Sequence, residues 1–192
     1  KATREIMPSS PINHKMIFAN YTIRLLSIQD LDAYFQLVEQ NRERLEDFFT
    51  GTVSRTRTVE DTRVFLGDIT QRAMDRAYFP YIIVDTTNNK IAGFIDLKNI
   101  DWNIPKSELG MYMDKEYANK GIASEAFRLF CDFCFEEYQF QKLFLRTHQQ
   151  NTFARRLAEK CGFEIEGIIR RDYKTTTGEL VDLLYYGKLS SD

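Results

Sequence analysis

Cysteine is scarce in this chain, which holds only Cys131, Cys134 and Cys161 among its 192 residues. Three cysteines cannot build the disulfide framework of a small secreted protein, so we expect a reducing, cytoplasmic location. Cys131 and Cys134 form a C-x-x-C, but no second pair and only two histidines, His14 and His148, accompany it. We therefore expect two cysteines on a helix face, and no zinc or other metal.

Long apolar runs and an excess of one charge are also missing. No stretch reaches the roughly 20 apolar residues that a membrane-spanning helix needs, and no secretory signal opens the sequence. Lys and Arg number 26 and Asp and Glu number 28, which gives a net charge of −2. This balance disfavours a general electrostatic interaction with nucleic acid or a membrane surface, so we expect neither as a partner.

The length and composition suit one domain with a sizeable core. The chain begins with a polar stretch that contains proline. We expect residues 1–18 to be a mobile lead-in and residues 19–192 to form the single domain.

Hydrophobic periodicity predicts the order of the elements. Helical spacing occurs in residues 27–40, 42–49 and 151–160 and after residues 58 and 121. Strands are expected in residues 21–26, on both sides of a turn within 78–100, and in 106–113, 142–148, 163–171 and 179–189. This order is typical of an α/β (α+β) fold. It has one mixed, mostly antiparallel sheet of about seven strands, flanked by helices, with a strand–helix–strand crossover at its centre.

A glycine stands where the central helix begins, in "YANKGIASEA". Inside a helix Gly costs about 1 kcal/mol against Ala. Gly121 therefore serves either a turn or the close approach of another molecule to the backbone. Free N–H groups and the helix dipole make such a helix start a ready site for phosphate or pyrophosphate, and Lys120 would add a positive charge. A simple turn is the alternative.

This stretch, followed about thirty residues later by "NTFARRLAEKCGFEIEG", resembles the GNAT superfamily of acyl-CoA-dependent N-acetyltransferases. "GIASEA" and "EKCGFEIEG" are most similar to its branch of ribosomal-protein N-terminal (alanine/serine) acetyltransferases. The resemblance covers roughly Tyr21 to Lys188. It implies the GNAT fold, acetyl-CoA as cosubstrate, and a homodimer, because relatives are often dimers.

The resemblance also implies which residues bind the cosubstrate. Gly121 and Ala123 match the family's phosphate loop, whereas Ala118 stands where Arg or Gln is usual. The loop binds through backbone N–H groups more than through side chains, so this departure leaves the expectation intact. The family also places the strand before the loop, and an Asn that begins the next helix, along the cofactor. The residues so implied are Met111, Tyr112, Met113, Asn119, Lys120, Gly121, Ile122, Ala123, Ser124 and Asn151.

For the chemistry, the resemblance implies Glu108 as the catalytic base, because relatives often use a Glu at the start of this strand to take the amine proton through water. A surface carboxylate without a catalytic role is the alternative, and Asp96 is a substitute base. Two positions that can donate a proton to the leaving thiolate in the family hold Ala154 and Ala158 here. Either Tyr173 or water donates instead, or the thiolate leaves unprotonated.

These features predict an N-acetyltransferase that moves an acetyl group from acetyl-CoA to a primary amine. The acceptor is a protein N-terminus, such as that of a ribosomal protein, or a small amine such as a polyamine or amino sugar. A non-catalytic acyl-CoA-binding or regulatory module is the alternative from another class, and the two alanines would suit it. Aromatic residues are more often core than substrate groove, with Trp102 the best candidate for an exception. The acceptor-groove candidates are Phe48, Phe49, Tyr78, Phe79, Tyr81 and Trp102.

Overall fold

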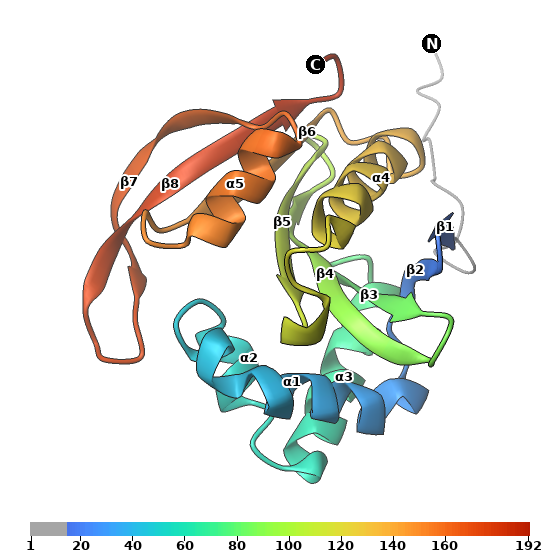
Figure 1. Ribbon diagram of the computed structural model, residues 1–192. Helices are drawn as coiled ribbons and strands as arrows, with labels where there is room; N and C mark the ends of the chain where they lie inside the picture. The colour runs from blue at the N-terminus through green and yellow to red at the C-terminus, as the bar shows by residue number, and fades with distance from the viewer. Residues whose placement is uncertain (1–14) are drawn as a thin grey trace.

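Eight strands form one open sheet in the order β1-β2-β3-β4-β5-β6-β8-β7 within residues 15–192, the part of the chain that this computed structural model describes (Figure 1). All neighbouring strands are antiparallel except β5 and β6, which run parallel. The strands are β1 (Met16–Phe18), β2 (Tyr21–Leu25), β3 (Phe79–Asp85), β4 (Lys90–Asp101), β5 (Lys106–Met113), β6 (Lys142–Thr147), β7 (Glu164–Lys174) and β8 (Leu180–Leu189). The predicted fold class is confirmed, with one strand more than expected.

The additional strand is β1, which pairs with β2 so that Met16 lies opposite Ile23. Met16 and Phe18 are buried in the same core as Ile23. These contacts hold the end of the expected lead-in within the sheet. Residues 1–14 of that lead-in lie outside the described part of the chain.

Helices cover both faces of the sheet (Figure 1). Tyr34 of α1 and Leu66 of α3 pack with Phe94 on one face, and α4 and α5 pack on the other through residues such as Phe127 and Leu157. The helices are α1 (Leu31–Glu46), α2 (Thr50–Ser54), α3 (Val59–Met74), α4 (Ile122–Glu136) and α5 (Thr152–Lys160), with short 3-10 helices η1 (Ile28–Asp30) and η2 (Lys115–Tyr117).

Local signals in the sequence set the helix starts. Thr58 Oγ1 accepts a hydrogen bond from the Asp61 N–H at 3.0 Å, and Asp61 accepts one from the Thr58 N–H at 3.2 Å. This capping box begins α3. A second box, formed by Ser27 and Asp30, caps η1 rather than α1 itself. The helix expected in residues 42–49 is mostly part of α1, because buried Leu45 continues the apolar stripe of that helix.

The central crossover runs from β5 through α4 to β6. Cys131 and Cys134 lie on the buried face of α4, where burial raises the pKa of both thiols well above the ordinary value. They are core residues of this helix, as the sequence predicts. Among residues 15–192, no group of three or more His, Cys, Asp or Glu side chains could hold a metal ion. No helix in this range is long and apolar enough to cross a bilayer.

Candidate active site

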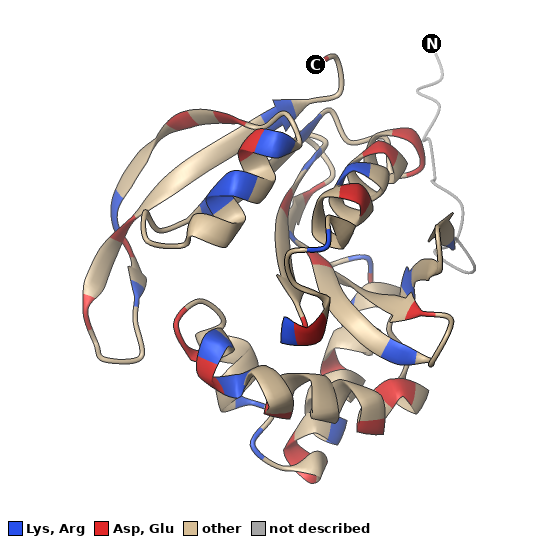
Figure 2. Cartoon of the chain, in the orientation of Figure 1, with Lys and Arg blue, Asp and Glu red and all other residues tan. Residues whose placement is uncertain are grey.

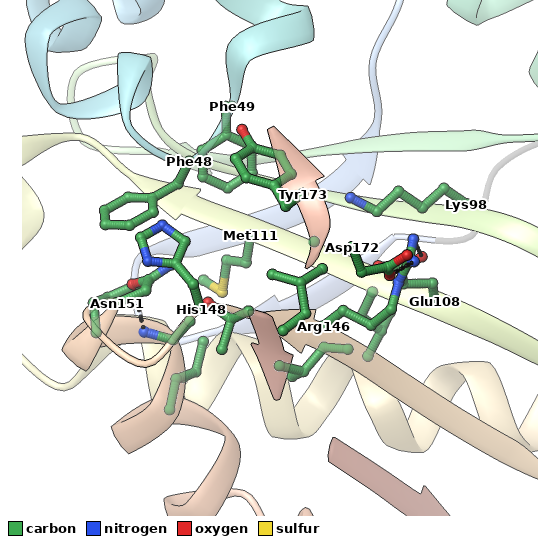
Figure 3. Close-up of a pocket in the computed structure, with 18 of the residues that line it drawn as sticks. Phe48, Phe49, Lys98, Glu108, Met111, Arg146, His148, Asn151, Asp172 and Tyr173 are labelled. Atoms are coloured by element: carbon green, nitrogen blue, oxygen red, sulfur yellow. Dashed lines mark hydrogen bonds and ion pairs between the residues drawn. The ribbon is translucent and has the colours of Figure 1, made fainter. Parts of the chain in front are cut away.

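The two parallel strands at the centre of the sheet separate soon after they meet. β5 and β6 pair only from Lys106 opposite Lys142 to Glu108 opposite Phe144. Beyond this point one edge of β5 has no neighbouring strand in the described part of the chain, so its backbone groups are available to another molecule. A cavity opens in this wedge (Figure 3). Its lining includes Phe48, Phe49, Lys98, Glu108, Gly110, Met111, Arg146, His148, Asn151, Phe153, Ala154, Leu157, Asp172 and Tyr173.

A second cavity lies at the N-terminus of α4. Gly121 is the N-cap residue of this helix, with φ of 78°, and Asn119 has φ of 60°. The turn therefore needs left-handed backbone, which Gly adopts without strain and Asn tolerates. The backbone N–H groups of residues 119–124 donate no hydrogen bond within the described chain. Free donors and the positive end of the helix dipole thus lie together at this cavity.

The two cavities adjoin each other along α5, and together they are called the groove. Phe153 and Leu157 of α5 line both of them. Arg156 and Lys160, also on α5, line the cavity at the start of α4, and Figure 2 shows basic residues on this helix. One end of the groove, at α4, is therefore cationic and suited to an anion, and the other end is the wedge between β5 and β6.

Glu108 lies in the wedge, where an ion-pair network holds its carboxylate (Figure 3). The side chain is 4% exposed. Arg146 donates through Nε to Oε1 at 3.2 Å and through a terminal nitrogen to Oε2 at 3.0 Å, while Asn99 donates to Oε2 at 2.6 Å. Arg146 also donates to Asp172 at 2.7 Å. The hydrogen bond to Glu108 is the main cause that raises the pKa of Arg146 above its ordinary value.

A β-bulge brings Asn99 to this network. The register of β4 against β5 shifts between Lys98 and Asp101, and Asn99 within the bulge has φ of 48°. A bulge of this kind redirects a side chain at the edge of a site. Glu108 thus receives donors from the bulge in β4 and from β6, which fixes its position where β5 and β6 begin to separate.

His148, which follows β6, is a cavity residue that the sequence analysis did not select. Its ring lies 4.6 Å from the ring of Phe48 and 6.3 Å from that of Tyr173, between centroids. Its Nε2 is buried and has no hydrogen-bond partner among the described residues. Strand alternation places residue 148 on the same face as Arg146. The sequence gives no sign that this face lines a site, because the ion pair of Arg146 with Glu108 forms only in the folded chain.

The residues implied for cofactor binding divide between the two cavities. Met111 and Asn151 line the wedge, while Met113, Asn119, Gly121, Ala123 and Ser124 line the cavity at α4. Three of the expected residues line neither. Ile122 is buried in the core, Lys120 lies over the ring of Tyr117, and the Tyr112 hydroxyl shares a hydrogen bond with Tyr34 on the opposite face of the sheet.

The aromatic candidates for an acceptor groove also divide. Phe48 and Phe49, between α1 and α2, line the wedge. The prediction for Trp102 is wrong, because its ring stacks on Phe140 at 5.2 Å, its indole N–H donates to a backbone carbonyl, and it lines neither cavity. The other three, Tyr78, Phe79 and Tyr81, are buried core residues.

The positions that lack a proton donor differ in their surroundings. Ala154 lines the wedge, and its N–H is capped by Asn151 Oδ1 at 3.1 Å. Ala158, one turn further along the same face of α5, is fully buried in the core. Tyr173 reaches across from β7 to α2, where its hydroxyl donates to Thr50 Oγ1 at 3.3 Å. Among the donors considered, Tyr173 is thus the one whose side chain lies at the wedge.

The sequence matches the acetyltransferase (GNAT) domain family over residues 20–164. The "Putative ribosomal N-acetyltransferase YdaF" of Bacillus subtilis (strain 168) is 30% identical to it over 174 residues, which cover 89% of this chain and 92% of that protein.

Solved structures share the fold. The ribosomal-protein-S5-alanine acetyltransferase from Vibrio fischeri superposes with a TM-score of 0.86 at 21% identity, over 94% of this chain and 98% of that one. RimL, a ribosomal L7/L12 alpha-N-protein acetyltransferase in complex with coenzyme A, gives a TM-score of 0.83 at 17% identity, over 92% and 98%. At these identities the likeness concerns the fold alone.

Proposed function

The chain belongs to the acetyltransferase (GNAT) domain family, and from this premise we propose that it transfers an acetyl group from acetyl-CoA to the N-terminal amine of a protein. The observation that carries the proposal is the pair of adjoining cavities, one at the free N–H groups that begin α4 and the other in the wedge beside Glu108. The ribosomal substrates named for YdaF and for the Vibrio fischeri enzyme support a protein N-terminus as the acceptor.

The chain's own residues fit coenzyme A. The N–H groups of residues 119–124 and the side chains of Arg156 and Lys160 would neutralise the pyrophosphate. The unpaired edge of β5 would hydrogen-bond the amides of the pantetheine arm, with Met111 and Met113 beside it. The bound molecule supplies the thioester.

The hydrogen bonds that hold Glu108 leave one acceptor position of its carboxylate free. A carboxylate offers about four acceptor positions, and the hydrogen bonds from Arg146 and Asn99 occupy three of them. We propose that the fourth receives the amine proton through a water molecule. Backbone N–H groups of β5 would stabilise the charge on the carbonyl oxygen, a contribution of about 3–4 kcal/mol. Because Ala154 offers no proton, the thiolate leaves without help from α5.

A free-thiol assay tests the proposal. The protein and acetyl-CoA are mixed with peptides that begin with Ala or Ser, with the same peptides acetylated at the N-terminus, and with spermidine and glucosamine. We expect turnover of the free-amine peptides and none of the blocked ones. Turnover of a small amine alone would show that the acceptor is a small molecule and not a protein N-terminus. Binding of coenzyme A without turnover of any amine would favour a non-catalytic module.

Asn151 provides a test of cofactor contact that separates stability from binding. Asn151→Ala removes the cap on the Ala154 N–H and should lower the free energy of unfolding by about 1 kcal/mol. Asn151→Asp keeps a cap of equal rank but loses the amide N–H₂, so stability should hold while affinity for coenzyme A falls about tenfold. Thermal unfolding and calorimetric titration measure the two effects. If Asn151→Asp binds coenzyme A with wild-type affinity, the side-chain amide of Asn151 does not contribute to binding.

The proposal extends to location and assembly. Three free, buried cysteines support the reducing cytoplasm. The outer strand β7 exposes Ile165 and Ile168, the latter 56% exposed, and its outer edge has no neighbouring strand within residues 15–192. An exposed apolar edge of this kind supports a homodimer.

A further inference from the structure

Three carboxylates lie at the wedge or directly behind it, and two of them share one arginine. Glu108 and Asp172 both receive hydrogen bonds from Arg146 (Figure 3). The third, Asp96, lies opposite Gly110 in the pairing of β4 with β5, and no ion pair joins it to a basic residue of the described chain. Asp96 is therefore the carboxylate of this region that no ion pair of the described chain engages.

One oxygen of Asp96 is held and the other is not. The Tyr78 hydroxyl donates to Oδ2 at 2.7 Å, which fixes the orientation of the carboxylate. Oδ1 is buried and has no hydrogen-bond partner among the described residues. The residue as a whole is 9% exposed, so little of it is open to solvent. An acceptor left unpaired in this way costs about 1–3 kcal/mol, a cost that a donor brought by a ligand would offset.

Gly110 connects Asp96 to the cavity. Gly110 lines the wedge, and a Cβ added to it would collide with Asp96 Oδ1. The carboxylate thus occupies the space that a side chain at position 110 would fill. A glycine inside a strand often marks such a close approach.

Lys98 is the basic residue nearest to this space. Its Nζ lies 3.2 Å from the position of the added Cβ, and its side chain extends toward Tyr173 (Figure 3). It forms no ion pair with Asp96, and its flexible stem lets the ammonium move aside. The region therefore already admits an ammonium group beside Gly110.

The phenol groups behind Asp96 carry no charge, and the cation there, Arg72, lies over the ring of Tyr78 at 4.8 Å. The hydroxyls of Tyr34 and Tyr112 bond to each other at 2.9 Å. Burial is the main cause that raises the pKa of Tyr112 well above its ordinary value, and the charge of Asp96 is one of the lesser causes. Arg72 forms no ion pair with Asp96 among the described residues, so the groups in contact with the carboxylate on this side are neutral phenols.

We propose that Asp96 binds the ammonium group of the acceptor over Gly110, before that group loses its proton. The inference rests on the proposed function, because it concerns the acceptor of that reaction. Asp96 is a specificity-determining residue for a cationic primary amine, and Glu108 remains the group that receives the proton.

Propylammonium and the neutral 1-propanol are probes of this subsite. Each is titrated into the coenzyme A complex at constant ionic strength, and the amide resonance of Gly110 is followed by NMR. We expect a saturable shift with propylammonium alone. Asp96→Asn should raise its Kd at least tenfold, whereas Asp68→Asn, which removes a charge from an exposed part of α3, should leave it unchanged. Gly110→Ala, whose methyl group displaces Asp96 Oδ1, should also raise it.

Two results would overturn the proposal, namely an unchanged Kd in folded Asp96→Asn or no saturable shift in the wild type. Steady-state kinetics with an Ala-initiated peptide keep this question apart from the proposed function. In Asp96→Asn the KM for the peptide should rise at least tenfold while the KM for acetyl-CoA holds. If the wild type acetylates no amine, the proposed function fails, but the propylammonium titration still decides the role of Asp96.

Discussion

Gly121→Asn should lower the affinity for coenzyme A about 100-fold, or about 2.7 kcal/mol, in a protein that stays folded. Asn tolerates the left-handed backbone that Gly121 requires. A Cβ at this position meets no atom within 4 Å, so the fold has room for a side chain. That side chain would stand in the cavity at the start of α4 and separate the pyrophosphate from the backbone N–H groups. Hydrogen bonds to a charged group contribute about 1.5–3 kcal/mol each.

Gly178→Asn is the matched control for this experiment. Gly178 lies in the turn between β7 and β8 with φ of 87°, and an added Cβ there meets only the end of Lys174 at 3.9 Å. The substitution imposes a similar backbone cost away from the groove, so affinity should not change. Calorimetric titration gives both affinities, and thermal unfolding reports the fold. Wild-type affinity in Gly121→Asn would contradict binding at this helix start.

Where the fold was predictable from the sequence, a local pattern and the packing agreed. The capping box of Thr58 and Asp61, which begins α3 where helical spacing was expected, needs only neighbouring residues. The strand β1 was missed because three residues carry no periodic signal, and only their pairing with β2 stabilises them. The end of α1 was misplaced because polar residues 42–44 hide the continuing helical spacing at Leu45.

The parts of the site that depend on local backbone conformation were predictable. The parts that depend on contacts between side chains far apart in the sequence were not. Gly121 marked the helix start through its own conformational freedom. Nothing local connects Arg146 to Glu108 or to Asp172, because these residues lie far apart in the chain and meet only in the folded sheet. Trp102 was misassigned since its loop position gave no sign of Phe140 beneath it. Gly110 is a glycine inside a strand, which is visible in the sequence. Its reason, the space that the Asp96 carboxylate takes up, becomes clear only when Asp96 is seen opposite it in the sheet.

Glu108→Gln should lower kcat by 10²- to 10⁴-fold near neutral pH, the range of general base catalysis, with little change in affinity for coenzyme A. Gln keeps the shape of the side chain but cannot accept a proton, and its N–H₂ must face the donors of Arg146 or Asn99. We therefore also expect stability to fall by about 1–3 kcal/mol, so rates are measured well below the unfolding transition.

The pH profile separates catalysis from this structural cost. At higher pH more of the acceptor amine is neutral in solution and needs no base, so the rate of Glu108→Gln should recover in part. Asn99→Ala serves as the comparison, because it removes the 2.6 Å hydrogen bond but keeps the carboxylate. It should lose less activity and keep the wild-type profile. If Glu108→Gln shows the wild-type rate and profile, the carboxylate serves only to anchor Arg146 where β5 and β6 separate. The proton then leaves by another route. One structural candidate is Nε2 of His148, which lines the same cavity and has no hydrogen-bond partner among the described residues.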